Sequence, residues 1–237
     1  MKIKAVLFDL DGTLLPMQDQ GRFIKLYFDS LTEYMVGYGY EPKEFMAAMW
    51  HSVMAMMKND GSEINEDIFW REFEGIYGER AVADRAKIDE FYTTDFEKTK
   101  AACGYSPRAR ETVELVKATG RRVILATNPV FPRAATERRI GWAGLSPSDF
   151  ELVTAYDNAS YSKPSGAYYN EILKKAGLTP EECLMVGNDT RDDMSAQNVG
   201  MRVFLLTDCL INESGEDISK YPHGDFDALA EYIKNLD

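Results

Sequence analysis

The stretch Asp9-Leu10-Asp11-Gly12-Thr13-Leu14 directly follows an apolar run from Ile3 to Phe8. That run is short, almost continuously apolar and partly β-branched, which is typical of a strand buried in a parallel sheet. Gly12 then ends the strand. Ligands of open α/β sheets bind beyond the carboxyl ends of the strands, so the carboxylates of Asp9 and Asp11 are placed to share one site. Because like charges repel, the pair favours a cation between them, and Mg²⁺ is the divalent ion found with carboxylates and phosphates.

The composition argues against several classes of protein. The 237 residues suffice for one large domain or for a core domain with a smaller one. We expect no secretory signal and no membrane partner, because no apolar run approaches the roughly 20 residues of a membrane span. The formal charge of -12 disfavours nucleic acid as a partner. Three widely spaced cysteines predict a cytoplasmic protein without a disulfide framework, and with only two histidines a zinc site is not expected.

The chain changes character twice, which predicts an inserted helical unit. Residues 1–16 read as a strand and its loop, and residues 17–99 carry apolar residues at helical spacing. We therefore expect an α/β core from residues 1–16 and 100–237, and a helical unit from residues 17–99. The methionines at positions 46, 49, 54, 56 and 57 favour a hydrophobic core in that unit over an adaptable ligand surface.

Residues 100–237 alternate between strand and helix patterns, which predicts a parallel sheet with right-handed crossovers. Capping residues and glycines mark the ends of several helices. Strands are expected at 122–126, 151–155, 183–186 and 202–206, and helices at 108–119, 133–140, 165–176 and 193–199, with a last helix around 226–233.

Polar residues stand at four places where this sheet should end. They are Asp9 with Asp11, Thr127-Asn128, Lys163, and the run Gly187-Asn188-Asp189-Thr190-Arg191-Asp192-Asp193. Taken singly, Thr127-Asn128 is more often a turn, Lys163 more often a solvated surface lysine, and the acidic run commonly a helix N-terminus, whereas Asp9 with Asp11 is as typical of a solvated turn as of a site. A parallel sheet brings the loops after its strands to one edge, so their order along the chain favours a joint site.

This set of residues suits phosphoryl transfer. Asp9 can act as a carboxylate nucleophile, and Asp11 can protonate the leaving oxygen and then accept a proton from water. The hydroxyl of Thr127 and nearby backbone amides can hold phosphate oxygens. Lys163 can offset the negative charge of the nucleophile and the phosphate. Asp189 and a neighbouring acid can complete a Mg²⁺ site.

With these motifs the chain resembles the hydrolases of the haloacid dehalogenase superfamily. Asp9-Leu10-Asp11-Gly12-Thr13 is similar to the first family motif, Thr127-Asn128 to the second, Lys163-Pro164 to the third, and Gly187-Asn188-Asp189 with Asp192-Asp193 to the fourth. The resemblance implies a three-layer, doubly wound parallel sheet, an α-helical cap of the first type, Mg²⁺ as cofactor and a phosphoaspartyl enzyme. It also implies that Thr127, Asn128 and Lys163 bind the substrate.

The fourth motif departs from the commonest family pattern. An ungapped match places Asn188 and Asp192 on its two acidic positions, whereas a shift by one residue places Asp189 and Asp193 there. We favour Asp189 as the direct Mg²⁺ ligand, because an ionised carboxylate binds this cation better than an amide does. The expected metal site then comprises Asp9, Asp11, Asp189 and Asp193, with Asp193 or Asp192 acting through water.

The expected activity is Mg²⁺-dependent hydrolysis of a small phosphorylated metabolite. Family members that cleave carbon–halogen bonds lack the acid two residues after the nucleophile, so Asp11 disfavours a dehalogenase. The phosphonate hydrolases resemble Asp-x-Ala at this site and are disfavoured as well. A phosphosugar mutase and a non-catalytic protein that binds a phosphorylated ligand remain alternatives within the family.

A receiver-type signalling domain is an alternative outside it. Such domains also place Asp, Thr and Lys on a doubly wound sheet, but they lack a helical insertion of this length. The sequence does not name the substrate or indicate an oligomeric state. Gln18, Gln20, Arg22 and Arg133 are candidates for substrate contacts, because they lie close to the first and second motifs.

Overall fold

The computed structural model describes residues 2–236, which contain one parallel sheet of six strands. The strand order is β3-β2-β1-β4-β5-β6, and it reverses between β1 and β4. In doubly wound sheets this switch point is where a ligand crevice opens. The strands are β1 Ala5–Phe8, β2 Arg122–Leu125, β3 Leu152–Val153, β4 Cys183–Gly187, β5 Arg202–Leu206 and β6 His223–Gly224.

Helices cover both faces of the sheet, which confirms the predicted three-layer α/β fold. Val6 and Phe8 of β1 face the layer formed by helices α5 (Pro107–Ala118), α6 (Arg133–Trp142) and α8 (Phe226–Lys234). Ala5 and Leu7 face helix α7 (Gly166–Ala176) and a 3₁₀ segment at Met194–Val199. All four side chains are fully buried. Burial on both faces explains why this strand is continuously apolar rather than alternating.

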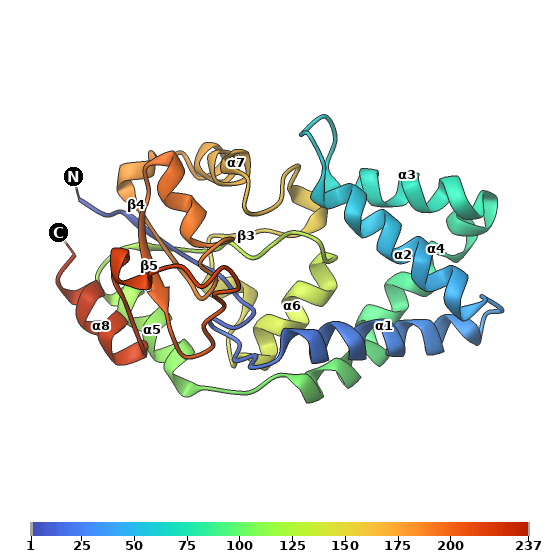
Figure 1. Ribbon diagram of the computed structural model, residues 1–237, viewed down its shortest axis with the longest axis horizontal. Coiled ribbons are helices and arrows are strands. Elements are labelled where there is room, and N and C mark those ends of the chain that lie inside the picture. The colour runs from blue at the N-terminus through green and yellow to red at the C-terminus, as the bar shows by residue number, and fades with distance from the viewer. Residues whose placement is uncertain (1, 237) are drawn as a thin grey trace.

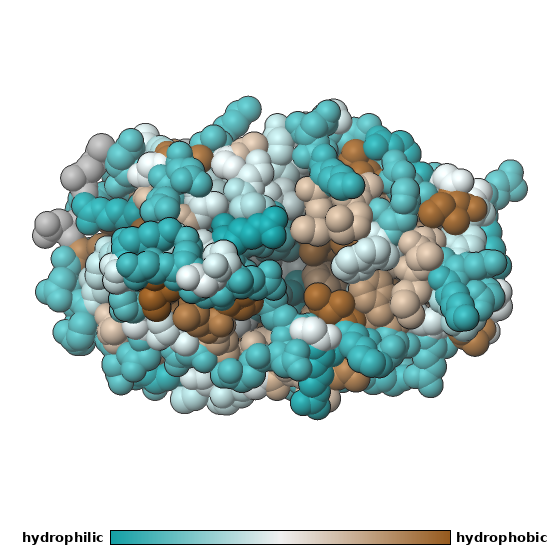
Figure 2. Space-filling view, viewed as in Figure 1, coloured by the Kyte–Doolittle hydropathy of each residue, from teal (hydrophilic) through white to brown (hydrophobic). Residues whose placement is uncertain are grey.

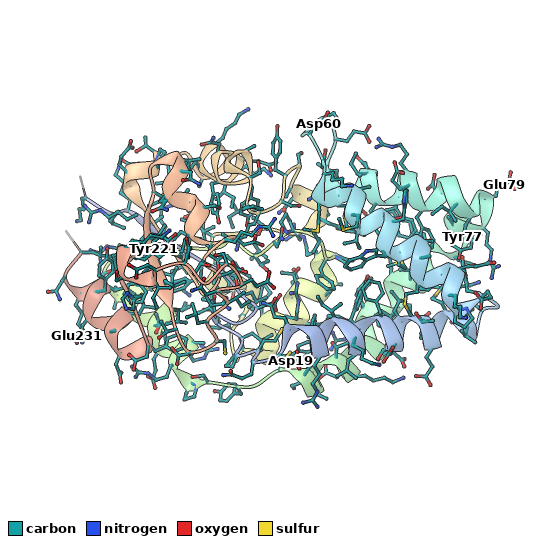
Figure 3. All side chains as sticks on the ribbon, in the orientation of Figure 1. Asp19, Asp60, Tyr77, Glu79, Tyr221 and Glu231 are labelled. Carbon is teal, nitrogen blue, oxygen red and sulfur yellow. The ribbon has the colours of Figure 1, made fainter. Side chains whose placement is uncertain are left out.

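Helices α1 to α4 follow β1 along the chain and form the right-hand part of Figure 1. We call them the helical segment: α1 Gln20–Val36, α2 Pro42–Met57, α3 Asn65–Tyr77 and α4 Glu79–Thr93. Its interior is rich in aromatic rings; Tyr27 of α1, for example, packs edge-on against Phe91 of α4 at a centroid distance of 6.3 Å. Figure 3 shows Asp19, which caps α1, near the boundary with the sheet, and Glu79 at the far end.

The expected elements are present, but several details differ. β3 spans two residues rather than 151–155, and β6 was not anticipated. Both are edge strands of the sheet, where few residues pair and the apolar pattern is weak. Residues 194–199 form 3₁₀ turns instead of an α-helix. Among the methionines, Met49 and Met56 are buried as expected, Met54 is half-buried, and Met46 and Met57 are 40% and 44% exposed, which contradicts the prediction for these two. No helix in residues 2–236 is long and apolar enough to cross a bilayer.

Candidate active site

Lys163 connects two of the predicted site loops. Its Nζ lies 2.7 Å from Oδ1 of Asp9 and 2.6 Å from Oδ1 of Asp193. The Lys163 side chain is 2% exposed, so both are buried, charge-assisted hydrogen bonds. Burial disfavours the ammonium, but the carboxylates of Asp193 and Asp9 outweigh it and hold the pKa of Lys163 above its ordinary value. Lys163 therefore remains a cation between the loops that follow β1 and β4.

The loop after β1 is packed tightly against the loop after β4. The hydroxyl of Thr13 donates to Oδ1 of Asn188 at 2.9 Å and lies 3.3 Å from Oδ2 of Asp9. Gly12 has a φ of +87°, and a Cβ at this position would lie 2.3 Å from Nδ2 of Asn188. Glycine is therefore required both by the backbone conformation and by the close approach of the amide.

Asp11 forms an ion pair with Arg139, a residue that the sequence analysis did not place in the site. The guanidinium contacts Oδ2 of Asp11 and lies over the ring of Phe131, with Cζ 4.4 Å from the centroid. Arg139 is 1% exposed. Burial raises the pKa of Asp11, and Arg139 opposes that shift. Helical spacing in the sequence could have indicated that Arg139 is buried, because it shares the buried face of α6 with Ala135 and Thr136.

Asn188 and Asp193 hold the loop after β4 in place. Nδ2 of Asn188 donates to the carbonyl oxygen of Cys209 at 2.7 Å, and the backbone amide of Asp189 donates to Oδ2 of Asp193 at 3.0 Å. Both side chains are buried. With Oδ1 bound to Lys163, the Asp193 carboxylate is engaged at both oxygens. Burial raises its pKa, and Lys163 counteracts the effect.

Asp189 and Asp192 are the more open acids of this loop. Oδ1 of Asp189 accepts the backbone amides of Arg191 and Asp192 at 2.7 and 3.0 Å. Its Oδ2 takes no hydrogen bond from the residues that the structure describes. Burial raises the pKa of Asp192, and the neighbouring Asp189 adds to the shift. Asp189 is thus oriented by the backbone while one carboxylate oxygen stays available.

Thr127 and Asn128 follow β2 and are fixed through their backbone and amide. The carbonyl oxygen of Thr127 accepts the hydroxyls of Thr154 and Tyr168 at 2.7 and 2.8 Å. The backbone amide of Lys163 donates to Oδ1 of Asn128 at 3.3 Å. These bonds tie the second and third motifs together and leave the Thr127 hydroxyl available to a ligand.

One cavity of about 360 Å³ is lined by residues of all four motifs. It lies between the carboxyl edge of the sheet and the helical segment, and Figure 2 shows a hollow there with hydrophilic residues on the sheet side. The residues predicted for catalysis, substrate binding and metal binding all line it: Asp9, Asp11, Thr127, Asn128, Lys163, Asp189 and Asp193. Asn188 and Asp192, the alternatives for the fourth motif, line it as well.

The family model for haloacid dehalogenase-like hydrolases matches residues 3–200, a span that includes every motif residue of this cavity. This chain belongs to that family. The pyrophosphatase PpaX from Bacillus cereus (strain AH820) is 28% identical over 211 residues, which cover 87% of this chain and 84% of the relative. Glyceraldehyde 3-phosphate phosphatase from Pyrococcus furiosus is 28% identical over 207 residues, covering 85% and 79%.

The fold likeness extends to the whole chain. The crystal structure of a HAD phosphatase from Thermococcus onnurineus aligns with a TM-score of 0.61 at 19% identity and covers 99% of both chains. Membership of the haloacid dehalogenase-like family excludes the receiver-type alternative. The strand order agrees, because receiver domains have the order 2-1-3-4-5, whereas here β2 and β4 flank β1.

The acidic end of the cavity has features that suit a cation. Oδ1 of Asp11 is buried and has no hydrogen-bond partner among residues 2–236. Asp9 and Asp189 line the same end, together with the amide of Asn188. Within the described residues no three acidic, histidine or cysteine side chains converge closely enough to hold a metal alone. A cation here would therefore need further oxygens from water or phosphate, which is how Mg²⁺ is usually bound.

Of the four candidates for substrate contacts, one lines the cavity and three do not. Gln20 lines the cavity. Arg133 instead pairs with Asp157 at 2.9 Å, and Nε2 of Gln18 donates to the carbonyl oxygen of Asp208 at 3.1 Å. Arg22 is exposed at the start of α1 and is not among the lining residues.

Proposed function

We propose that this protein is a Mg²⁺-dependent phosphatase that hydrolyses a small phosphorylated metabolite through a phosphoaspartyl intermediate. The observation that carries the proposal is the contact of Lys163 with Asp9 in a cavity that Asp11 and Thr127 also line. Family membership and the phosphatase names of both relatives support it. Hydrolysis of phosphate monoesters is extremely slow without a catalyst, so a nucleophile, an acid and a charge-neutralising group are all required.

In the first step, a carboxylate oxygen of Asp9 attacks phosphorus and the bond to the leaving alcohol breaks. Asp11 gives its proton to the leaving oxygen. In the second step, Asp11 takes a proton from the water that attacks the aspartyl phosphate, and inorganic phosphate leaves as Asp9 is restored. The Thr127 hydroxyl and the Lys163 ammonium hold the phosphoryl oxygens while charge builds up on them.

Asp9 and Asp189 are the groups that would hold Mg²⁺ directly, with Asp193 acting through water. Asp11, also predicted as a ligand, would keep its free oxygen for the proton that it transfers, because Arg139 occupies the other oxygen. When bound, the cation offsets the negative charge of the phosphoryl group and orients it. The fit rests on the unpartnered oxygen of Asp189 and on the acidic residues that line this end of the cavity. Asp193 also holds Lys163 and the backbone amide of Asp189, so it positions both of these residues.

In this proposal the helical segment is a cap of the first type. It corresponds to residues 17–99, and residues 1–16 with 100–237 form the catalytic core. The segment covers the cavity opposite the motif residues and would exclude water during phosphoryl transfer.

The test is an Asp9→Asn variant, assayed with a panel of phosphorylated metabolites and 4-nitrophenyl phosphate in the presence and absence of Mg²⁺. Asn cannot form the aspartyl phosphate, so turnover should fall below detection while the circular dichroism spectrum and Tm stay near those of the wild type. Asp67→Asn, an exposed residue of α3, is the matched control. Retained hydrolysis in Asp9→Asn would refute the nucleophile, and formation of hexose 6-phosphate from a hexose 1-phosphate would indicate a mutase.

A further inference from the structure

The end of the cavity opposite the catalytic residues is almost entirely apolar. Helices α1 and α2 contribute Phe23, Ile24, Phe28, Trp50, Val53 and Met57. Figure 2 shows hydrophobic residues gathered on this side of the hollow, over the helical segment. Within the described part of that segment, the lining residues with a polar group are Gln20, Tyr27 and Trp50, whose indole carries a single N–H. The Tyr27 hydroxyl is 2.7 Å from that of Tyr92, so this residue presents its ring rather than a free hydroxyl.

Positive charge is scarce in the cavity. Among the described lining residues Lys163 is the only cation, and it is already bound to Asp9 and Asp193. A second phosphate or a carboxylate on the substrate would have to approach without a partner, and an unpaired anion in a partly buried site is costly. The cavity therefore has one place for an anionic group, at the catalytic end.

Three large apolar side chains at the cavity remain unusually open to solvent. Trp50 is 49% exposed, Met57 44% and Ile24 43%. An apolar patch that continues into a catalytic pocket is typical of a ligand-binding surface. Trp50 is also oriented in advance, because it packs edge-on against Phe28 at a centroid distance of 5.7 Å. All three line the same cavity, so an apolar group bound there would have them within its walls.

We propose that the substrate is a phosphate monoester whose alcohol part is uncharged and apolar, with an aromatic ring as the best fit. The inference rests on the proposed phosphatase function and adds the class of substrate. It separates this chain from its relatives named for pyrophosphate and glyceraldehyde 3-phosphate, which are small polar molecules. A cavity of about 360 Å³ lies at the lower end of the range for small-molecule sites and has room for a ring beside the phosphate.

The test compares benzyl phosphate with ethyl phosphate, pyrophosphate and phosphoglycolate, all with Mg²⁺. Benzyl and ethyl alcohol are leaving groups of similar acidity, so a difference in kcat/KM reports contacts of the ring. Burial of a phenyl group predicts that kcat/KM for benzyl phosphate is roughly 10 to 100 times that for ethyl phosphate. Pyrophosphate and phosphoglycolate should both fall below ethyl phosphate.

The variant Trp50→Ala should reduce the benzyl-to-ethyl ratio by roughly tenfold, because it removes the largest apolar surface facing the ring. Ile76→Ala truncates an equally exposed apolar residue outside the cavity and should leave the ratio unchanged. An equal loss for both substrates in Trp50→Ala would mean that Trp50 serves closure of the helical segment, and it would overturn the inference.

Binding separates failure of this inference from failure of the proposed function. Benzylphosphonate and ethylphosphonate are not hydrolysed at the carbon–phosphorus bond, so their dissociation constants can be measured by calorimetry in any case. Tighter binding of benzylphosphonate, by about tenfold or more, would support the apolar site even if no ester were hydrolysed. Equal affinities, or preference for the ethyl compound, would overturn the inference even if the protein proved to be an active phosphatase.

Discussion

The guanidinium of Arg139 forms an ion pair with Asp11, the second carboxylate of the loop after β1. Arg139 is 1% exposed and is held from below by the ring of Phe131. A buried arginine thus fixes one oxygen of the proposed acid and base, while the other oxygen stays without a partner. This arrangement explains how Asp11 can stay in place beside Asp9 although the two carboxylates repel each other.

Replacing Arg139 by Met should leave Asp11 as an uncompensated charge. We expect the free energy of unfolding to fall by about 3 kcal/mol and kcat to fall more than KM rises. The measurement is urea unfolding together with steady-state kinetics. In Arg139→Met/Asp11→Asn, most of the stability should return while activity stays absent. If the double variant were as unstable as Arg139→Met, packing on Phe131 rather than the ion pair would account for the effect.

Replacing Lys163 should destabilise the protein for the same reason as replacing Arg139, and by at least as much, because Lys163 pairs with two carboxylates. Lys163→Met leaves Asp9 and Asp193 as buried like charges, so we expect a loss of about 3 to 5 kcal/mol in the free energy of unfolding. Adding Asp193→Asn should recover more than 1 kcal/mol, as expected for residues coupled by direct contact. Activity should be absent in both variants. Additive effects on stability would contradict the coupling.

Gly12→Ala tests the close approach of the loops after β1 and β4. The new Cβ would displace the Asn188 amide and break its bonds to Thr13 and Cys209. We expect a loss of about 2 to 4 kcal/mol, from strained backbone together with lost buried hydrogen bonds. Gly120→Ala is the matched control, since φ is +76° there and no atom lies within 4 Å of the added Cβ. A similar loss in both variants would show that only backbone strain matters.

The choice within the fourth motif can be tested by titrating Mg²⁺. If Asp189 is the direct ligand, Asp189→Asn should raise the Mg²⁺ concentration for half-maximal activity by roughly 10- to 100-fold. Asp192→Asn makes the same change of charge three residues further along the same loop and should have a smaller effect. Chelation with EDTA should abolish wild-type activity, and excess Mg²⁺ should restore it. Equal Mg²⁺ requirements in the two variants would argue against the assignment of Asp189.

The sequence was sufficient for the four inner strands of the sheet and for the placement of the motif residues at its edge, because both follow from local rules. A buried strand such as β1 must be continuously apolar, and the residue after it must lie at the edge of the sheet. Arg139 could not be assigned in the same way, since its partner Asp11 lies 128 positions away and no local pattern connects them. The helical phase alone marked Arg139 as buried.

The residues of the helical segment that line the cavity could not be predicted from the sequence for a related reason. Met56 and Met57 are neighbours on α2, yet Met56 is fully buried and Met57 is open at the cavity. Which of the two side chains contacts a ligand depends on how α2 is oriented relative to the sheet. Helical periodicity does not determine that orientation. At the start of α1, likewise, Gln20 lines the cavity and Arg22 does not.

The central position of β1 has a consequence for biosynthesis. β1 begins at Ala5, whereas β4, its partner on one side, begins only at Cys183. The ribosome therefore releases β1 long before it synthesises β4. Until then, the apolar edge of β1 that will pair with β4 remains unpaired in the nascent chain. Phosphoryl chemistry can begin only after the loop that follows β4 has emerged, so products of translation interrupted before Asp193 should be inert.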